Sequence, residues 1–192
     1  EGKLSEDNVT IGNNVTGDPA IREALNVGID RQALLDGALN GYGDVNYNGV
    51  ADQLGWSFET DYKDGDVDKA KSILAAAGWN DTDNDGIVDK DGQKASFSIY
   101  YNSQASERQA IAVAVSEQAK EIGIEIEPVG GSWDDIDPVR FQQGVVWGFG
   151  SADPYSIEHQ YGSDVACVGY DNPGNLQDSA VDALIDKAMA QP

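Results

Sequence analysis

DPAIREALNVGIDRQALLDGALNGYG, residues 18–43, predicts two short helices that meet at a sharp corner. Asp18 is placed to cap the first helix, and Pro19 fits its first turn because proline lacks an N–H that a helix leaves unbonded there. Asp30 begins the second helix, and the glycine-rich exit NGYG ends it. The apolar side chains recur at helical spacing, as Ile21, Ala24, Leu25 and Gly28 in the first helix and Ala33, Leu34, Ala38 and Leu39 in the second. Both helices are therefore expected to pack one side against a shared core.

The same periodicities extend over the rest of the chain and predict an α/β fold. Helices are expected at 67–77, 105–122 and 177–189, with a short one broken near Pro138 at 134–142, and strands at 95–101, 124–129 and 144–150. Strand, helix and strand in direct succession favour a parallel pair joined by a crossover. The near-continuous apolar run GVVWGFG favours a central strand. We expect a small mixed sheet of about three to five strands flanked by helices.

Composition narrows the classes of partner. A chain of 192 residues with 40% apolar residues can bury one substantial core. The net charge of −22 opposes binding to nucleic acid and to anionic membrane surfaces. Cys167 is the only cysteine, so neither an internal disulfide nor a cysteine-rich metal cage can form. One histidine, one cysteine and no nucleophile signature give no support to an enzyme.

Four segments in a fixed order resemble a known receptor family. The helix pair matches it at Ile21, Arg22, Ala24, Leu25, Ile29, Asp30, Arg31, Leu34 or Leu35, and Gly41, and the other matching segments are 66–79, 141–163 and 176–188. Together they resemble the second lobe of the extracellular solute-binding proteins of family 5, the peptide, nickel and oligosaccharide receptors of ABC importers.

This resemblance implies a domain organisation and a function. Residues 1–17 would be an inter-lobe linker or crossover strand, and residues 18–192 the C-terminal lobe of a type II periplasmic-binding-protein-like fold whose first lobe is absent. The receptor would capture a small solute, with a peptide as the leading candidate, in a cleft between the lobes and deliver it to a membrane permease. It would be periplasmic or extracellular, anchored by a lipoprotein signal that this chain does not contain, and would require no cofactor.

The segment WGFGSADPY, residues 147–155, is the candidate ligand site. Glycines at the end of a strand let a ligand approach the backbone, an aromatic ring supplies a wall, and an acid can pair with a cation. In family members that bind peptides, an acid after this aromatic meets the peptide amino group. Counting three positions on from Trp147 or Phe149 reaches Gly150 or Ala152, which leaves Asp153 as the available acid. The candidate ligand-binding residues are Trp147, Gly148, Phe149, Gly150 and Asp153, with Arg140 and Trp133, and Ser132 beside them.

These candidates also have structural interpretations. Trp147 could be a core residue, and Asp153 could cap the helix that Pro154 begins. Arg140 could pair with Asp134 or Asp137 at the surface instead of meeting a ligand carboxylate.

The sharpest local motif is NDTDNDGIVDKDG, residues 80–92. Calcium prefers six to eight oxygen ligands, and alternating acids around a glycine turn can supply several of them. The candidate ligands are the side chains of Asp81, Asp83, Asp85 and Asp89 and the carbonyl of Ile87. Gly92 stands at the twelfth position, where an EF-hand has a bidentate Glu. The alternatives are therefore a calcium-binding surface or interaction module and a solvated helix-to-strand turn.

His159 invites a nickel interpretation, because imidazole is a ligand that suits nickel. A surface histidine on a short helix is the favoured alternative.

Overall fold

The computed structural model describes residues 3–51, 53–58, 60–148 and 153–190. Its helices are α1 (Pro19–Gly28), α2 (Arg31–Leu39), α3 (Val67–Ala76), α4 (Ser106–Glu121), α5 (Trp133–Ile136), α6 (Ser156–Tyr161) and α7 (Ser179–Met189), with 3₁₀ turns at Asp137–Val139 and Ser163–Val165. Its strands are β1 (Lys3–Leu4), β2 (Thr10–Ile11), β3 (Asp89–Lys90), β4 (Gln93–Lys94), β5 (Ser96–Asn102), β6 (Glu125–Gly131) and β7 (Gly144–Val145). The predicted α/β class is confirmed.

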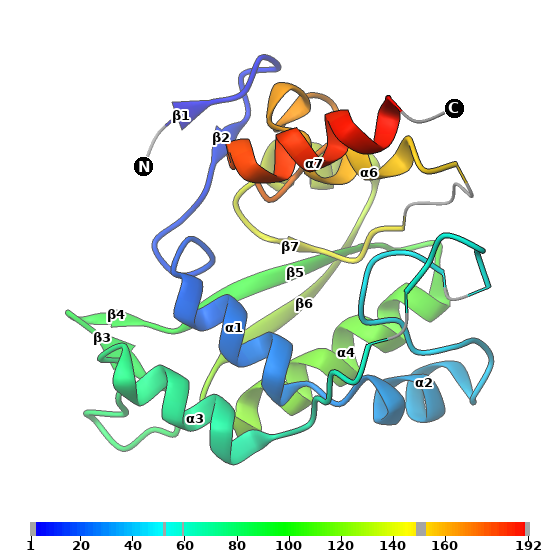
Figure 1. The fold of residues 1–192 in the computed structure, drawn as a ribbon. Coiled ribbons are helices and arrows are strands. Elements are labelled where there is room, and N and C mark those ends of the chain that lie inside the picture. Colours follow the sequence, from blue (N-terminus) through cyan, green and yellow to red (C-terminus); the bar gives the residue numbers. More distant parts are fainter. Residues whose placement is uncertain (1–2, 52, 59, 149–152, 191–192) are drawn as a thin grey trace.

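A three-stranded parallel sheet in the order β6-β5-β7 lies at the centre (Figure 1). β5 and β6 pair along their whole lengths, and α4 connects them and packs on both strands. The predicted parallel strand–helix–strand unit is therefore confirmed. Two antiparallel pairs, β1–β2 and β3–β4, stand apart from this sheet, so both strand orientations occur in the described fold.

The prediction that residues 144–150 form a central strand is wrong for the part that the structure describes. Within it, β7 pairs only with β5 and lies at the edge of the sheet. Gly144 approaches Ile99 so closely that a Cβ would lie 3.3 Å from Ile99 Cγ1. After Val145 the chain leaves the sheet, and the apolar Trp147 packs on other aromatic rings instead of on a neighbouring strand.

The helix pair forms as predicted because both caps are present. Asp18 accepts a hydrogen bond from Ala20 N at 2.9 Å, and Asp30 accepts one from Ala33 N at 2.8 Å. The second helix ends at Asn40, whose φ of 52° is left-handed, one residue before the predicted glycine. α2 buries no residue completely, and Ala33, which was predicted on its apolar side, is exposed.

The main core lies between α1, α3, α4 and the sheet. It is built from apolar side chains that are almost fully buried, including Ile21, Ala24, Ala70, Leu74, Ala119, Ile122, Ile124 and Ile126. In Figure 1, α6 and α7 lie together on the other side of the strands. Ile185 of α7 is buried, whereas the neighbouring Leu184 is 67% exposed.

The first residues pack against the chain near residue 140. Gly12 N donates to Phe141 O at 2.8 Å, and Asp7 forms an ion pair with Arg140 at 2.7 Å. Val15 is buried in the main core. Their role as a connection between lobes stays a prediction. Among the described helices, none has the length and apolar character needed to cross a membrane.

Candidate functional site

Three chain segments meet beyond the carboxyl edge of the parallel sheet. β5, β6 and β7 all end at this edge because they are parallel. Arg108 follows β5 in the first turn of α4, Trp133 opens α5 directly after β6, and Trp147 follows β7. Ligands of open α/β sheets bind outside the carboxyl ends of the strands, so this edge is the candidate site.

The two tryptophans form an aromatic cluster with Tyr170. Trp147 stacks on Tyr170 with ring centroids 4.2 Å apart and an interplanar angle of 1°. Trp133 meets Trp147 edge-on at 5.0 Å and Tyr170 at 6.1 Å. Each ring restrains the others, so the cluster presents a preformed surface. We call these three residues the aromatic cluster.

A pocket of about 200 Å³ opens beside the aromatic cluster. Trp147, Tyr170 and Val145 supply apolar wall, and Arg140 and Gln143 supply polar groups. A pocket of this size with mainly apolar walls accepts one side chain or a similar small group, and not a whole drug-sized ligand.

Trp147 is 36% exposed, so the core interpretation of this residue is wrong. It lies at the surface and lines the pocket, as the ligand-site prediction requires. Gly148 is also exposed, and Phe149 and Gly150 lie outside the described residues. Asp153 Oδ1 accepts a hydrogen bond from Tyr155 N at 3.0 Å, directly before α6. That contact favours a local role for Asp153 at the start of this helix.

Arg140 is held by the protein itself. Its side chain is buried, with Nε donating to Gly169 O and Nη1 to Asp137 O, both at 2.8 Å. Its ion-pair partner is Asp7, so the predicted pairing with Asp134 or the Asp137 carboxylate is wrong. The carboxylate of Asp137 accepts instead from the Tyr170 hydroxyl. Arg140 therefore fixes the back of the pocket.

Ser132 and Trp133 begin α5. Ser132 donates to Asp135 Oδ2 through its hydroxyl at 2.7 Å and its backbone N–H at 2.9 Å. The hydrogen bond from the Ser132 hydroxyl, with the backbone one, lowers the pKa of the Asp135 carboxyl. These contacts fix the start of the helix and with it the position of the Trp133 ring, while Ser132 itself is occupied.

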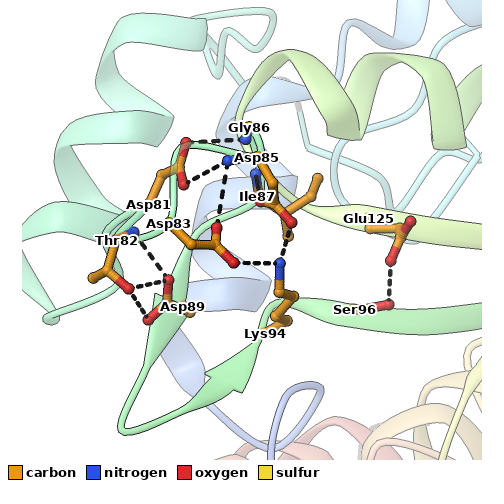
Figure 2. A network of polar contacts seen from close by, with 10 residues as sticks. All are labelled: Asp81, Thr82, Asp83, Asp85, Gly86, Ile87, Asp89, Lys94, Ser96 and Glu125. Carbon is orange, nitrogen blue, oxygen red and sulfur yellow. Dashed lines mark hydrogen bonds and ion pairs between the residues drawn. The ribbon is translucent and has the colours of Figure 1, made fainter.

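The acidic loop, residues 80–92, brings together the carboxylates of Asp81, Asp83 and Asp85, whose nearest oxygens lie within 4.8 Å of one another. Figure 2 shows how the protein uses them: Asp81 accepts from Gly86 N at 3.0 Å, and Asp85 accepts from Ile87 N at 2.9 Å. The Lys94 ammonium contacts Asp83 at 3.0 Å and also contacts Asp85.

These contacts oppose the calcium prediction for the loop. Asp89 turns to Thr82, whose N and Oγ1 both donate to it, so it does not join the other three acids (Figure 2). Lys94 supplies the positive charge that the prediction assigned to calcium, and the hydrogen bonds that its ammonium donates to Asp85 and Asp83 raise its pKa. The loop has the features of the solvated helix-to-strand turn.

His159 lies on α6 and pairs with Asp171, with Nδ1 and Oδ2 2.7 Å apart. Within the described ranges, the structure gathers no set of three metal-ligating side chains that includes it. The nickel interpretation therefore gains no further ligand here.

Two residues of the site were not predicted, Tyr170 and Arg108. Tyr170 lies in an irregular segment after the 3₁₀ turn Ser163–Val165, where no periodicity points to a site. Arg108 could have been found, because it follows a predicted strand of a parallel unit and so had to lie near the carboxyl edge.

Comparison with known proteins gives consistent matches. The family model "Bacterial extracellular solute-binding proteins, family 5 Middle" matches residues 6–164. Protein XP55 of Streptomyces lividans is 37% identical over 90% of this chain and 32% of its own length. The oligopeptide-binding protein AppA of Bacillus subtilis is 40% identical over 62% of this chain and 22% of its own.

Solved structures agree with the sequence matches. The structure of AppA in complex with a nonapeptide has a TM-score of 0.79 at 30% identity, covering 94% of this chain and 37% of that one. NikZ of Campylobacter jejuni in complex with Ni(L-His) has a TM-score of 0.81 at 25% identity, with the same coverage. This level of similarity confirms the predicted type II periplasmic-binding-protein-like fold. The chain spans about a third or less of the curated relatives named above.

Proposed function

The chain belongs to family 5 of the bacterial extracellular solute-binding proteins, and from this premise we propose that it forms one wall of a solute-binding cleft in an ABC-importer receptor. The observation that carries the proposal is the aromatic cluster with its pocket at the carboxyl edge of the sheet. A receptor that binds solutes needs no catalytic groups. This site offers aromatic rings, a pocket and backbone groups that can contact a solute.

A peptide is the leading candidate solute. Over their structural matches, AppA, which is named for oligopeptide binding and was solved with a nonapeptide, is 30% identical to this chain, and NikZ with Ni(L-His) is 25% identical. A peptide also suits the pocket, because one apolar side chain would fill about 200 Å³ beside Trp147.

The proposed mechanism is closure of two lobes around the solute. Residues 18–192 would form the second lobe, and residues 1–17 would cross from the first. A solute that contacts both lobes stabilises the closed form, and a membrane permease would then recognise that form. The receptor would act outside the cytoplasmic membrane, where its family is found.

The test is solute binding by the full-length receptor that contains this chain. Ligands retained through purification are identified by native mass spectrometry, and their affinity is measured by calorimetry. Trp147→Ala should weaken binding by about 2 kcal/mol, roughly 30-fold, because it removes an aromatic wall at the centre of the site. Val113→Ala, on the exposed side of α4, should leave the affinity unchanged. Equal affinities of wild type and Trp147→Ala would reject the site.

A further inference from the structure

Three of the four threonines in the chain stand two positions after an asparagine. Asparagine makes up 12 of the 192 residues, so by chance only one threonine in 16 would stand there. The sequence Asn-x-Thr, with x other than proline, is an acceptor of N-linked glycosylation. This excess over chance needs an explanation. The acceptor sequences are Asn8-Val9-Thr10, Asn14-Val15-Thr16 and Asn80-Asp81-Thr82.

The asparagine side chains of the three acceptor sequences are open to solvent. All three residues are exposed, and none of their side-chain amides has a hydrogen bond to the described part of the chain. Asn40 and Asn84 share this property but lack the threonine. The other asparagines use their side chains within the fold, and these are Asn13, Asn26, Asn46, Asn48, Asn102, Asn172 and Asn175.

Asn13 and Asn14 show the difference at adjacent positions. The side chain of Asn13 holds the turn before α1, with Nδ2 donating to Gln142 O. Its Oδ1 accepts from Val15 N at 2.8 Å and from Thr16 N at 2.7 Å. Asn14 has no such contact and is exposed. The turn is complete without the Asn14 side chain, so a group attached to Asn14 Nδ2 would break no described hydrogen bond.

The backbone explains only part of the first acceptor sequence. Asn8 lies in the turn between β1 and β2 (Figure 1) with a φ of 61°, a left-handed conformation that asparagine tolerates well. Asn84 has the same φ, yet a glycine stands two positions after it. Thr10 lies in β2, and its hydroxyl has no hydrogen bond to the described residues. The turn therefore accounts for Asn8 but not for Thr10.

The threonine hydroxyls of the other two acceptor sequences do have partners. Thr16 donates to Gln142 O at 3.1 Å, and Thr82 donates to Asp89 Oδ1 at 2.9 Å (Figure 2). These contacts explain a hydroxyl residue at positions 16 and 82. They set no requirement for an asparagine two positions earlier, because neither contact involves the side chain of that asparagine.

We propose that the receptor is N-glycosylated at Asn8, Asn14 and Asn80. The inference goes beyond solute binding and rests only on the proposed location outside the cytoplasmic membrane, because N-linked glycans occur on secreted proteins. The co-substrate is an oligosaccharide whose C1 is linked to a polyprenyl phosphate. In the transfer, a bond forms between asparagine Nδ2 and C1 and the bond from C1 to the phosphate oxygen breaks. The lipid phosphate leaves with the electron pair of that bond, and one proton leaves Nδ2.

The pocket beside the aromatic cluster includes none of the acceptor asparagines. Its described lining comes from residues 140–147 and 170–174, and no acceptor sequence overlaps these ranges. Solute binding and glycosylation are therefore expected to be independent, and each can be tested without the other.

The experiment examines the full-length receptor purified from its native cells. Trypsin cleavage after Lys3, Arg22, Lys71 and Lys90 gives peptides 4–22 and 72–90. Peptide 4–22 contains two acceptor asparagines and Asn13, and peptide 72–90 contains the third and Asn84, so each peptide carries an internal control. Tandem mass spectrometry with electron-transfer fragmentation identifies the residue that carries a sugar.

Two kinds of variant test the acceptor sequence itself. Thr10→Ala, Thr16→Ala and Thr82→Ala each remove one acceptor sequence and keep its asparagine, whereas serine at the same position keeps the acceptor sequence. Tyr42→Thr creates a new one at the exposed Asn40, at a position where the tyrosine is 83% exposed.

We expect an oligosaccharide on each acceptor asparagine and none on Asn13 or Asn84. Each Thr→Ala variant should lose the oligosaccharide from its own site and keep it at the other two, which shows that the variant reached the same location. Each Thr→Ser variant should keep all three. Tyr42→Thr should gain a fourth, on Asn40. The solute affinity of every variant should equal that of wild type.

Several results would overturn the inference. Absence of sugar from all three asparagines in a wild type that binds its solute would reject it and leave the proposed function standing. Sugar on a threonine, or on Asn13 or Asn84, would reject it as well, because the acceptor sequence would then not direct the attachment. A single acceptor asparagine without sugar would reject that site. A glycosylated receptor that binds no solute would support the inference and count against the proposed function.

Discussion

The single carboxylate of Asp18 accepts hydrogen bonds from three separate parts of the chain. It accepts hydrogen bonds from Ala20 N at the start of α1, from Trp79 Nε1 at 3.0 Å and from Lys90 Nζ at 3.1 Å. Burial alone raises the pKa of Asp18, but the hydrogen bonds from Ala20, Trp79 and Lys90 outweigh it and hold the pKa below the ordinary value of 3.8. The ionised form is therefore the one that stabilises the fold.

Asp18→Asn should lower the free energy of unfolding by about 1–2 kcal/mol at pH 7, because hydrogen bonds to a charged group are replaced by weaker ones. A lowered folded-state pKa gives stability that is complete above the unfolded-state pKa and is lost as pH falls through the folded-state value. The difference between wild type and variant should therefore shrink below about pH 4. Urea unfolding at pH 7 and pH 3 measures both quantities.

Asp178→Asn is the matched control, because Asp178 caps α7 through the backbone N–H groups of Ala180 and Val181 alone. Asparagine caps helices about as well as aspartate, so this loss should stay below about 0.5 kcal/mol. Equal losses in the two variants would mean that the Trp79 and Lys90 contacts add nothing.

Residue roles were predictable from sequence where their causes are local. Asp18 and Asp30 cap helices that begin one residue later, and both predictions are confirmed. The partner of Arg140 is Asp7, which lies 133 positions away, and the ring that stacks on Trp147 is Tyr170 in an irregular segment. Such contacts depend on how the elements pack, so the local patterns predicted the wrong partner for Arg140 and none for Trp147.

At the scale of elements, the contact between α1, α3 and α4 depends on a glycine. A Cβ at Gly28 would lie 2.9 Å from Ala70 Cβ and 3.0 Å from Ile122 Cγ2, which belong to the neighbouring core. Gly37 of α2 is also helical, but a Cβ there would meet nothing within 4 Å. The same substitution should therefore have opposite effects at the two positions.

Gly28→Ala should destabilise the protein by about 1–3 kcal/mol, because the added methyl group forces the helices apart. Gly37→Ala should stabilise it by about 0.5–1 kcal/mol, because alanine favours helix and has room. Urea unfolding of both variants measures these changes in the free energy of unfolding. Stabilisation by Gly28→Ala would show that α1 can shift without loss of stability.

The elements themselves were predictable to different degrees. Long helices such as α4 repeat their pattern often enough to be placed within a residue at each end. The prediction of a central strand at 144–150 was wrong because apolar character does not distinguish a central strand from a segment that packs on aromatic rings. Only its first two residues pair in the described sheet, and Trp147 contributes to the site instead.

The acidic loop is an element in which Lys94 offsets part of the negative charge, through its contacts with Asp83 and Asp85. We expect calcium at millimolar concentration to leave the melting temperature of the wild type unchanged, because the ammonium holds Asp83 and Asp85. Lys94→Met frees both carboxylates, and calcium should then raise the melting temperature of this variant by about 3 °C.

Lys94→Met with Asp85→Asn is the control, and it should lose the response because one oxygen ligand with its charge is gone. Differential scanning fluorimetry with and without calcium measures all three proteins. An equal calcium response in wild type would show that the lysine is displaced, and would restore the calcium interpretation.

At the scale of the whole molecule, the net charge of −22 means that repulsion among the acidic residues lowers the stability of the folded state. Local ion pairs act against it, as between Lys90 and Asp18 or Arg31 and Asp64. Salt screens both effects, but repulsion among exposed acids extends over longer distances and is screened first. The sign of the salt effect therefore shows which of the two dominates.

We expect the melting temperature of the wild type to rise as NaCl increases from about 0.1 M to about 1 M, over which the screening length falls from about 10 Å to about 3 Å. The triple variant Glu23→Gln, Glu117→Gln, Glu121→Gln removes three exposed acids that take part in no described ion pair. It should be more stable than wild type at low salt by up to about 1 kcal/mol, and this advantage should vanish at high salt because screening removes the same repulsion. Thermal unfolding of both proteins across the salt series measures this. A fall in the wild-type melting temperature with salt would mean that the short-range ion pairs outweigh the repulsion.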